Sequence, residues 1–390
     1  MTTKKTKNAT FLKAAATAQH FGFDVASKLQ VSNDTIKLCA DNRKEKKYLD
    51  EYLPAMEEVG QLLMTYHEGE KESGSAPEFM YFDGPASGDH DKLRKRPGEE
   101  QVSLHILGAE KSIADALLIK TIQTMLIEDG AKDIMLLINN VGGKETQTQF
   151  NREATGFYRK NISLLSATCR QYFKDGIHTL VTQGADGCKI LKEHAPEPMD
   201  FLNEEGRLKF KELIECLETF NMPYEIDSNI LGDPNYSSHT VFQIVEAESR
   251  KVLAAGSRYN LLAKKLGCRK EISAISANVW LRKNKTITEK SLHTKNDNKF
   301  FLLQVGDRAK VLALQVLELL HTEGIPVRHR IVRDKLSSQI QHAQKLKCDH
   351  MLIIGHKEAI DRSVIVKDAQ GRSQRSVPIA ELPSYLKELK

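Results

Sequence analysis

Residues 226–267, IDSNILGDPNYSSHTVFQIVEAESRKVLAAGSRYNLLAKKLG, contain the pattern on which the fold prediction depends. A Gly/Asp/Pro/Asn turn cluster at 232–235 precedes an apolar run at 240–245, and a second apolar run follows at 252–255. This spacing predicts a β-hairpin, with Gly256 opening a helix. Because glycine lets a backbone approach a ligand closely, the end of the hairpin forms either a shelf for a small polar ligand or an ordinary sheet edge.

The same stretch resembles two signature segments of class II histidyl-tRNA synthetases, Arg-Gly-Leu-Asp-Tyr-Tyr-Thr-Gly-Thr-Val-Phe-Glu and Ala-Gly-Gly-Arg-Tyr-Asp. The family's catalytic arginine falls here on Leu231, and the last aspartate of the second segment falls on Asn260. The residues that carry the resemblance are Gly232, Tyr236, Thr240, Val241, Phe242, Ala255, Gly256, Arg258 and Tyr259.

A strand, basic loop and strand pattern spans residues 79–107, with the loop PASGDHDKLRKRPGEEQ at 85–101. It resembles the second class II motif, whose loop holds ATP and the acceptor end of tRNA. The family's arginine for the α-phosphate falls on Gly88. On the return strand, Gln101 matches a glutamine that recognises histidine, and His105 stands where the family has the glutamate that holds the amino group.

The third class II motif ends in Gly-Leu-Glu-Arg, and its ATP-binding arginine falls on Trp280, which predicts apolar filling of the nucleotide site. Amino-acid activation needs fixed positive charge, and loss of one positioned donor typically slows such a reaction by about 10²–10³. With Gly88, Leu231 and Trp280 at the three arginine positions, the resemblance implies that no catalytic residue is retained. It implies a residual amino-acid pocket lined by Gln101, Tyr236, Arg258 and Tyr259.

A chain of 390 residues is too long for one ordinary core and predicts two domains. Residues 1–285 are expected to form a class II synthetase-like α/β domain, an antiparallel sheet with helices, in which 145–174 are mostly helical and 33–50 are polar surface. Polar residues 286–298 are a predicted linker. The remaining residues, 299–390, form the second domain.

The C-terminal region alternates strand and helix patterns, which predicts a small α/β domain. Residues 299–390 contain 16 Lys and Arg against 10 Asp and Glu, so the net charge of +5 is concentrated there. The region resembles the anticodon-binding domain of histidyl, prolyl, threonyl and glycyl synthetases, with 335–339 at the Ser-x-Lys-Lys-Gln position of that domain. The predicted tRNA-binding residues are Arg328, Arg330, Arg333, Lys335 and Gln339.

Other features of the sequence exclude several classes of protein. No apolar run approaches the roughly 20 residues that a membrane span needs. The six cysteines form no Cys-x-x-Cys pair and there is no histidine cluster, so we expect no metal site and the reduced thiols of a cytoplasmic protein. The basic N-terminus fits either an organelle transit peptide or a packed first helix.

Three functions remain open at this point. The first is a histidyl-tRNA synthetase-like protein without aminoacylation activity, which binds tRNA or a protein partner and needs no cofactor. The second is a diverged but active histidine–tRNA ligase, which would use ATP and Mg²⁺. The third is a regulatory subunit like the one paired with ATP phosphoribosyltransferase, although that subunit generally lacks the C-terminal domain. The resemblance also implies a homodimer formed through the N-terminal domain.

Overall fold

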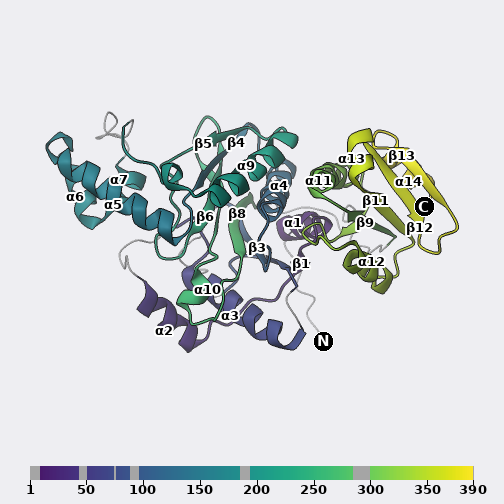
Figure 1. Ribbon diagram of the computed structural model, residues 1–390, viewed down its shortest axis with the longest axis horizontal. Helices are drawn as coiled ribbons and strands as arrows, with labels where there is room; N and C mark the ends of the chain where they lie inside the picture. Colours follow the sequence, from purple (N-terminus) through teal and green to yellow (C-terminus); the bar gives the residue numbers. More distant parts are fainter. Residues whose placement is uncertain are drawn as a thin grey trace.

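Two β-sheets organise the chain in the computed structural model, which describes residues 9–43, 51–73, 76–87, 96–184, 194–283 and 299–389. The larger sheet has eight strands and belongs to the N-terminal domain, and the smaller sheet has five strands and belongs to the C-terminal domain. Figure 1 shows the two domains side by side, with the C-terminal domain in yellow-green to yellow. The predicted linker, 286–298, lies outside the described residues.

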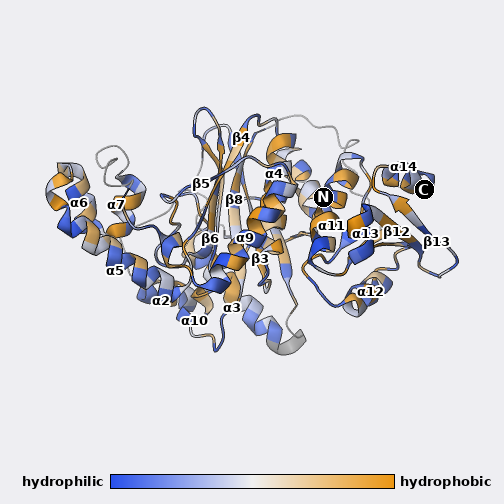
Figure 2. Ribbon diagram, turned by 45° about the horizontal axis from the view of Figure 1, so that its top comes forward, coloured by the Kyte–Doolittle hydropathy of each residue, from blue (hydrophilic) through white to orange (hydrophobic). Residues whose placement is uncertain are grey.

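The larger sheet is antiparallel at its centre, as the resemblance implies. The short strand at each edge pairs in parallel with its neighbour. Figure 2 shows that the central strands are largely hydrophobic. In sheet order, the strands are β1 (Asp24–Val25), β2 (Glu78–Phe82), β3 (Glu99–Leu107), β8 (Ala274–Arg282), β7 (Val252–Arg258), β6 (Ser238–Glu246), β4 (Ile134–Asn140) and β5 (Tyr224–Ile226).

Helices pack on both faces of this sheet, which explains why the central strands β3 and β8 are buried along most of their length. The layer on one face shares the main hydrophobic core and consists of α1 (Ala9–His20), α4 (Ile113–Glu128) and α9 (Glu204–Thr219). The opposite face packs against a second core that involves α2 (Asn33–Asn42), α3 (Met56–Ser73) and α10 (Leu262–Lys265).

Helix α2 lies in the region 33–50, where the sequence predicts only polar surface. The Ser32 side chain caps the helix by accepting a hydrogen bond from the Thr35 amide at 3.1 Å. Within α2, Thr35 and Cys39 are the buried residues. The hydrophobic repeat is therefore too sparse to reveal the helix, although its N-terminal cap is visible in the sequence.

The hairpin predicted within 226–267 is confirmed, but the helix predicted at Gly256 is wrong. Gly256 lies inside β7, which is paired with β6 on one side and β8 on the other. A Cβ at this position would come within 2.5 Å of the Phe242 ring and 2.7 Å of the Ser276 carbonyl oxygen. The glycine therefore makes room for neighbouring strands, and α10 begins only after β7 ends.

Residues 144–184 and 194–201 form a helical extension, which Figure 1 shows at the end of the domain far from the C-terminal domain. Its elements are α5 (Lys144–Lys160), η2 (Ile162–Leu164), α6 (Ala167–Asp175), α7 (Ile177–Gln183) and η3 (Pro198–Phe201). The helical segment predicted over 145–174 is therefore broken between α5 and α6. The extension has its own hydrophobic core, to which Leu231 and Val241 contribute from the sheet side.

The C-terminal domain is a mixed sheet with helices, as predicted. Strands β10, β9 and β11 are parallel, and the remaining two are antiparallel. The strands are β9 (Phe300–Gln304), β10 (Arg328–His329), β11 (His350–Ile354), β12 (Ser363–Asp368) and β13 (Gln374–Pro378). The helices are α11 (Asp307–Thr322), α12 (Leu336–Lys345), α13 (His356–Asp361) and α14 (Leu382–Glu388).

Helix α11 joins the two domains by packing against the N-terminal domain (Figure 1). Lys120 on α4 is almost fully buried, and its ammonium group forms an ion pair with Glu318 on α11. The same ammonium group lies 5.3 Å from the centre of the Phe220 ring. Lys111 and Asp334 form a second ion pair between the domains at 3.1 Å.

Three histidines meet at this interface. His20 Nε2 lies 2.7 Å from the Leu317 carbonyl oxygen, and the rings of His20 and His321 are 4.7 Å apart. His329 is buried against Gly22, where a Cβ would lie 3.0 Å from the imidazole ring. Burial, followed by the nearby His321, lowers the pKa of His20 to about 3. Burial, followed by Arg330, lowers the pKa of His329 to about 3.

These depressed pKa values predict that acid destabilises the fold. An unfolded histidine has a pKa near 6.5, so between about pH 6.5 and 3 the unfolded chain binds more protons than the folded chain. Lowering the pH through this window therefore removes stability, by about 2 kcal/mol per buried histidine between pH 7.5 and 5.0. His329→Gln should shrink the difference between urea unfolding free energies at these two pH values by about that amount. The exposed His356→Gln is the control, and an unchanged difference in His329→Gln would contradict the assignment.

Candidate functional site

The structure brings three residues of the predicted amino-acid pocket to one face of the larger sheet. Gln101 and His105 lie on the same side of β3 because side chains alternate along a strand. His105 Nδ1 lies 2.5 Å from Ser276 Oγ on β8, and the same oxygen lies 2.6 Å from the hydroxyl of Tyr259. Tyr236 meets Tyr259 edge to face, with ring centres 6.3 Å apart.

This face is covered by the residues that lead into α3. The Tyr236 hydroxyl donates a hydrogen bond to the Pro54 carbonyl oxygen at 2.5 Å, and the Asn278 amide donates to the Tyr52 carbonyl oxygen at 3.1 Å. Tyr236 is 3% exposed and Tyr259 is 0% exposed. Both tyrosines are therefore buried, and their hydroxyl groups are hydrogen-bonded to protein atoms.

Trp280 closes the neighbouring corner of the same face. It pairs with Gln101 across the strands and is 3% exposed. The guanidinium group of Arg96 lies 3.9 Å from the centre of the indole ring, and the ring of Tyr52 meets the indole edge-on at 6.0 Å. Arg96 also donates a hydrogen bond to the Val252 carbonyl oxygen at 2.7 Å. The indole therefore fills space between two strands and a stacked arginine.

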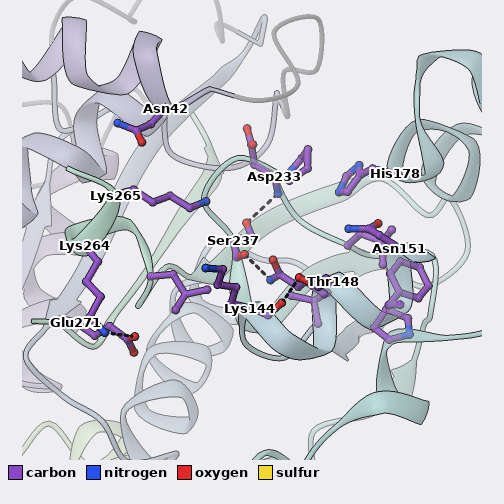
Figure 3. Close-up of a pocket in the computed structure, with 17 residues that line it drawn as sticks. Asn42, Lys144, Thr148, Asn151, His178, Asp233, Ser237, Lys264, Lys265 and Glu271 are labelled. Carbon is purple, nitrogen blue, oxygen red and sulfur yellow. Dashed lines mark hydrogen bonds and ion pairs between the residues drawn. The ribbon is translucent and has the colours of Figure 1, made fainter. Parts of the chain in front are cut away.

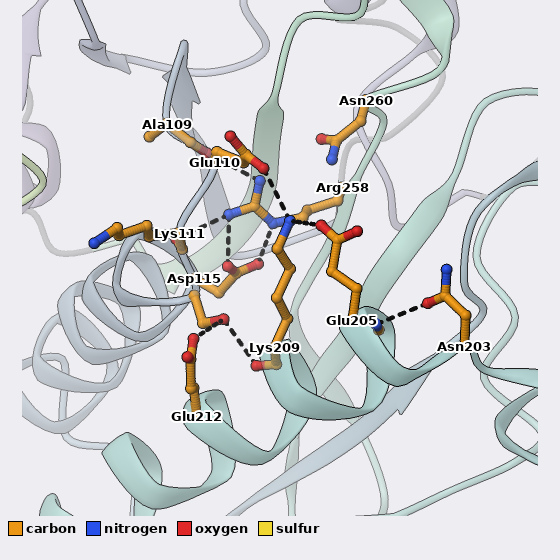
Figure 4. A network of polar contacts seen from close by, with 12 residues as sticks. Ala109, Glu110, Lys111, Asp115, Asn203, Glu205, Lys209, Glu212, Arg258 and Asn260 are labelled. Carbon is orange, nitrogen blue, oxygen red and sulfur yellow. Dashed lines mark hydrogen bonds and ion pairs between the residues drawn. The ribbon is translucent and has the colours of Figure 1, made fainter. Parts of the chain in front are cut away.

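Arg258 is the member of the predicted pocket that the structure removes from it. Its Nε and Nη2 atoms donate to the two carboxylate oxygens of Asp115 on α4, at 2.8 and 2.6 Å. Its guanidinium group also donates to the carbonyl oxygens of Ala109 at 3.0 Å and Lys111 at 3.2 Å, as Figure 4 shows. Because its donors are used inside the protein, Arg258 fastens β7 to α4 and is not available to a ligand.

Of the other two arginine positions, Gly88 lies outside the described residues, and Leu231 borders a hollow of about 580 Å³, shown in Figure 3. We call this hollow the α5 pocket, since α5 forms one wall. The residues that line it are Asn42, Val141, Lys144, Gln147, Thr148, Phe150, Asn151, His178, Pro198, Leu231, Asp233, Pro234, Ser237, Leu261, Lys264, Lys265 and Glu271. Sequence reasoning missed this site, although the Gly-Gly-Lys that follows a buried strand at 142–144 was a visible signal.

The predicted tRNA-binding residues gather on one side of the C-terminal domain, between β10 and α12. Arg328, Arg330 and Arg333 are half-exposed, and Lys335 is exposed. Arg330 Nε donates to His342 Nε2 at 3.2 Å. Partial burial, followed by the positive charges of Arg330, Arg333 and Lys345, lowers the pKa of His342. Positive charge is therefore concentrated here, and His342 and Lys345 join the set found in the sequence.

Gln339 corrects one of these predictions, because it is 0% exposed. Its amide nitrogen donates to the carbonyl oxygens of Gln304 at 2.9 Å and Arg333 at 3.0 Å. Its amide oxygen accepts from the Gln304 backbone at 3.1 Å. Gln339 therefore holds the loop that presents Arg333, and its own side chain does not reach the surface.

Several other expectations concern absent features. Within the described residues, no helix is long and apolar enough to cross a membrane, and no group of three or more His, Cys, Asp or Glu side chains could hold a metal ion. The thiols of Cys39, Cys216, Cys268 and Cys348 are free and buried. Cys169 is disulfide-bonded, which corrects the expectation that all six thiols are reduced.

Comparison with known proteins gives a domain match and several structural neighbours. Residues 299–389 match the family model described as anticodon binding domain. The apo structure of Staphylococcus aureus histidyl-tRNA synthetase aligns over 95% of this chain and 93% of its own, with a TM-score of 0.48 and 19% identity. A structure from Bacillus halodurans C, described as an ATP phosphoribosyltransferase regulatory subunit/histidyl-tRNA synthetase, aligns over 89% and 94%, with a TM-score of 0.45 and 14% identity.

Sequence relatives extend the likeness across most of the chain. Histidine–tRNA ligase of Staphylococcus carnosus is 23% identical over 80% of this chain and 74% of its own length. The ligase of Pediococcus pentosaceus is 26% identical over 80% and 74%. The ligase of Aquifex aeolicus is 25% identical over 72% and 69%. The chain is therefore similar to histidine–tRNA ligases over most of its length, and its C-terminal domain is an anticodon-binding domain.

Proposed function

We propose that this protein binds tRNA through its C-terminal domain and does not attach histidine to it. The lack of histidine attachment is inferred from one face of the larger sheet. There, Tyr236 and Asn278 form hydrogen bonds with the backbone of residues 52–54, which lies over this face. Trp280 and Arg96 close the adjoining corner. A nucleotide and an amino acid would have to displace packed protein in order to react there.

The first half of the proposal is supported by the anticodon-binding domain and by its basic surface. Arg330 and Arg333 are held in place by His342 and by Ser338, whose hydroxyl accepts a hydrogen bond from Arg333 at 3.0 Å. Guanidinium groups held in this way suit phosphate oxygens, because their planar donors match phosphate geometry. Single-stranded loops of RNA expose both phosphates and unstacked bases.

The tRNA proposal predicts a specific response to mutation and salt. In the full-length chain, Arg330→Ala, Arg333→Ala and Lys335→Ala together should weaken tRNA binding about tenfold or more. The slope of log affinity against log salt should become shallower by about 2, since each phosphate contact contributes roughly 0.7–0.9. Filter binding of total tRNA over a range of salt concentrations measures both quantities.

A matched variant controls for the loss of net charge. Lys357→Ala, Lys367→Ala and Arg372→Ala remove three positive charges elsewhere in the same domain and should leave the affinity within about threefold of the parent. If both triple variants bind tRNA like the parent, the basic surface is not the RNA site. The proposal would then fail, and a protein partner would become the better reading of this domain.

A further inference from the structure

The loop that carries the basic surface, residues 330–335, contains one acidic residue. Asp334 lies between Arg333 and Lys335, two of the residues predicted to bind tRNA. A carboxylate at this position repels phosphate groups, so it opposes the binding that its neighbours favour. The charge of the basic surface therefore does not explain why the loop contains Asp334.

Two lysines from different domains hold the Asp334 carboxylate. Lys310 on α11 is 2% exposed and donates a hydrogen bond to its Oδ1 atom. Lys111, just before α4 in the N-terminal domain, lies 3.1 Å from its Oδ2 atom. Partial burial raises the pKa of Asp334, but the hydrogen bonds from these lysines outweigh it and lower the pKa. Asp307 also lies near Lys111 and Lys310, at 3.7 and 3.6 Å, but its side chain is 89% exposed.

The N-terminal domain holds Lys111 in a fixed place. The Lys111 carbonyl oxygen accepts hydrogen bonds from the Arg258 guanidinium group at 3.2 Å and from the Ala114 amide at 3.0 Å. Arg258 is itself paired with Asp115 inside this domain. Figure 4 shows the Lys111 side chain pointing away from that pair. The backbone of Lys111 is therefore anchored in one domain, while its ammonium group reaches Asp334 in the other.

Other contacts hold the part of the 330–335 loop that precedes Asp334. The Arg333 carbonyl oxygen accepts hydrogen bonds from Gln304 Nε2 at 2.9 Å and from Gln339 Nε2 at 3.0 Å. Asp334 follows this carbonyl group and comes two residues before the first residue of α12. Its ion pairs therefore fix the end of the loop, on which the neighbouring basic side chains depend for their direction.

We propose that the N-terminal domain controls tRNA binding through Asp334, which acts as a positioning residue for the 330–335 loop. This inference rests on the proposed function, because it concerns the same basic surface. With Lys111 and Lys310 paired to Asp334, the loop presents its basic side chains in one arrangement, so less conformational freedom is lost when tRNA binds. Without the Asp334 charge, the buried Lys310 loses its nearer carboxylate and the end of the loop moves more freely.

Replacement of Asp334 distinguishes positioning from a simple effect of charge, because the two predict changes of opposite sign. Loss of a negative charge beside phosphate contacts should by itself tighten tRNA binding. If Asp334 positions the loop, Asp334→Asn should instead weaken binding about fivefold. The slope of log affinity against log salt should become shallower by about 0.7–0.9, as for the loss of one phosphate contact. Filter binding of total tRNA by the full-length protein measures both quantities.

Two further variants control this experiment. Asp334→Glu keeps the negative charge and should restore binding to within about threefold of the parent. Asp361→Asn removes one negative charge at the exposed end of α13 and should leave the affinity within about twofold of the parent. Unchanged or tighter binding by Asp334→Asn would overturn the inference.

Lys111 tests the part played by the N-terminal domain. Lys111→Ala should weaken tRNA binding about threefold in the parent and should have little effect in Asp334→Ala, since the lysine acts through the carboxylate. Lys111 is exposed, so its replacement should leave the fold intact. Equal effects in both backgrounds would show that Lys111 contacts tRNA directly, and would overturn control by the N-terminal domain.

Failure of this inference can be told apart from failure of the proposed function. A parent protein that binds no tRNA would refute the proposed function and, with it, this inference. A parent that binds tRNA, and loses affinity when Arg330, Arg333 and Lys335 are replaced, would support the proposed function. If Asp334→Asn and Lys111→Ala then bound like the parent, only the positioning role would be refuted.

Discussion

Purified protein should show no histidine-dependent exchange of pyrophosphate into ATP. We expect a rate at least about 10⁴-fold below that of Staphylococcus carnosus histidine–tRNA ligase assayed in parallel, since each missing charge donor typically costs about 10²–10³. Leu231 replaces one such donor with a buried apolar side chain. Trp280 replaces another with an indole that is stacked under Arg96. Arg258 cannot replace the missing charge, because its guanidinium group is paired with the Asp115 carboxylate at 2.6 Å.

Restoring two arginines distinguishes the two proposed causes of the expected inactivity, which are the missing positive charges and the covering backbone of residues 52–54. The double variant Leu231→Arg and Trp280→Arg should remain inactive, because the backbone of residues 52–54 still covers Tyr236. If the double variant gained exchange activity, the cover would be no barrier and substitution alone would explain the loss. Exchange by the parent within tenfold of the normal ligase would disprove the proposed lack of activity and would favour the active-ligase reading.

Removal of the Arg258 side chain should cause one of the largest losses of stability available to a single substitution in this chain. Arg258→Ala leaves the carboxylate of Asp115 buried without its partner, and also removes the donor to the Ala109 carbonyl oxygen. Breaking a buried ion pair in this way costs about 3–5 kcal/mol of unfolding free energy. Urea unfolding followed by circular dichroism at pH 7.5 measures the loss.

The exposed pair of Arg152 and Glu153 provides the control for this experiment. These side chains are in contact at 2.9 Å but lie largely in solvent, so Arg152→Ala should change stability by less than about 0.5 kcal/mol. Replacing both Arg258 and Asp115 with leucine should cost less than Arg258→Ala, because no unpaired charge remains. If Arg258→Ala were as mild as Arg152→Ala, the buried pair would not fasten β7 to α4.

Local sequence patterns were sufficient to predict much of the secondary structure of this protein. The turn and two apolar runs of 226–267 sufficed for the β6–β7 hairpin, and the alternating strand and helix patterns of 299–390 sufficed for the C-terminal α/β domain. The positions of Leu231 and Trp280, aligned with the family motifs, are the basis of the prediction that the protein does not activate histidine. Such features depend on neighbours within a few residues, or on periodicity along one element, and both are visible in the chain itself.

Partners that are distant in sequence were decided only by the tertiary structure. Arg258 has its carboxylate on α4, 143 residues away, so the sequence alone could not distinguish a ligand-binding arginine from an internal tie. Gln339 reads as a surface residue of a helix, yet its contact with Gln304 buries it. The α5 pocket collects residues between Asn42 and Glu271 from six separate stretches of chain. Helix and strand periods say which side of an element is apolar, but packing decides which polar side chains are left facing an open space.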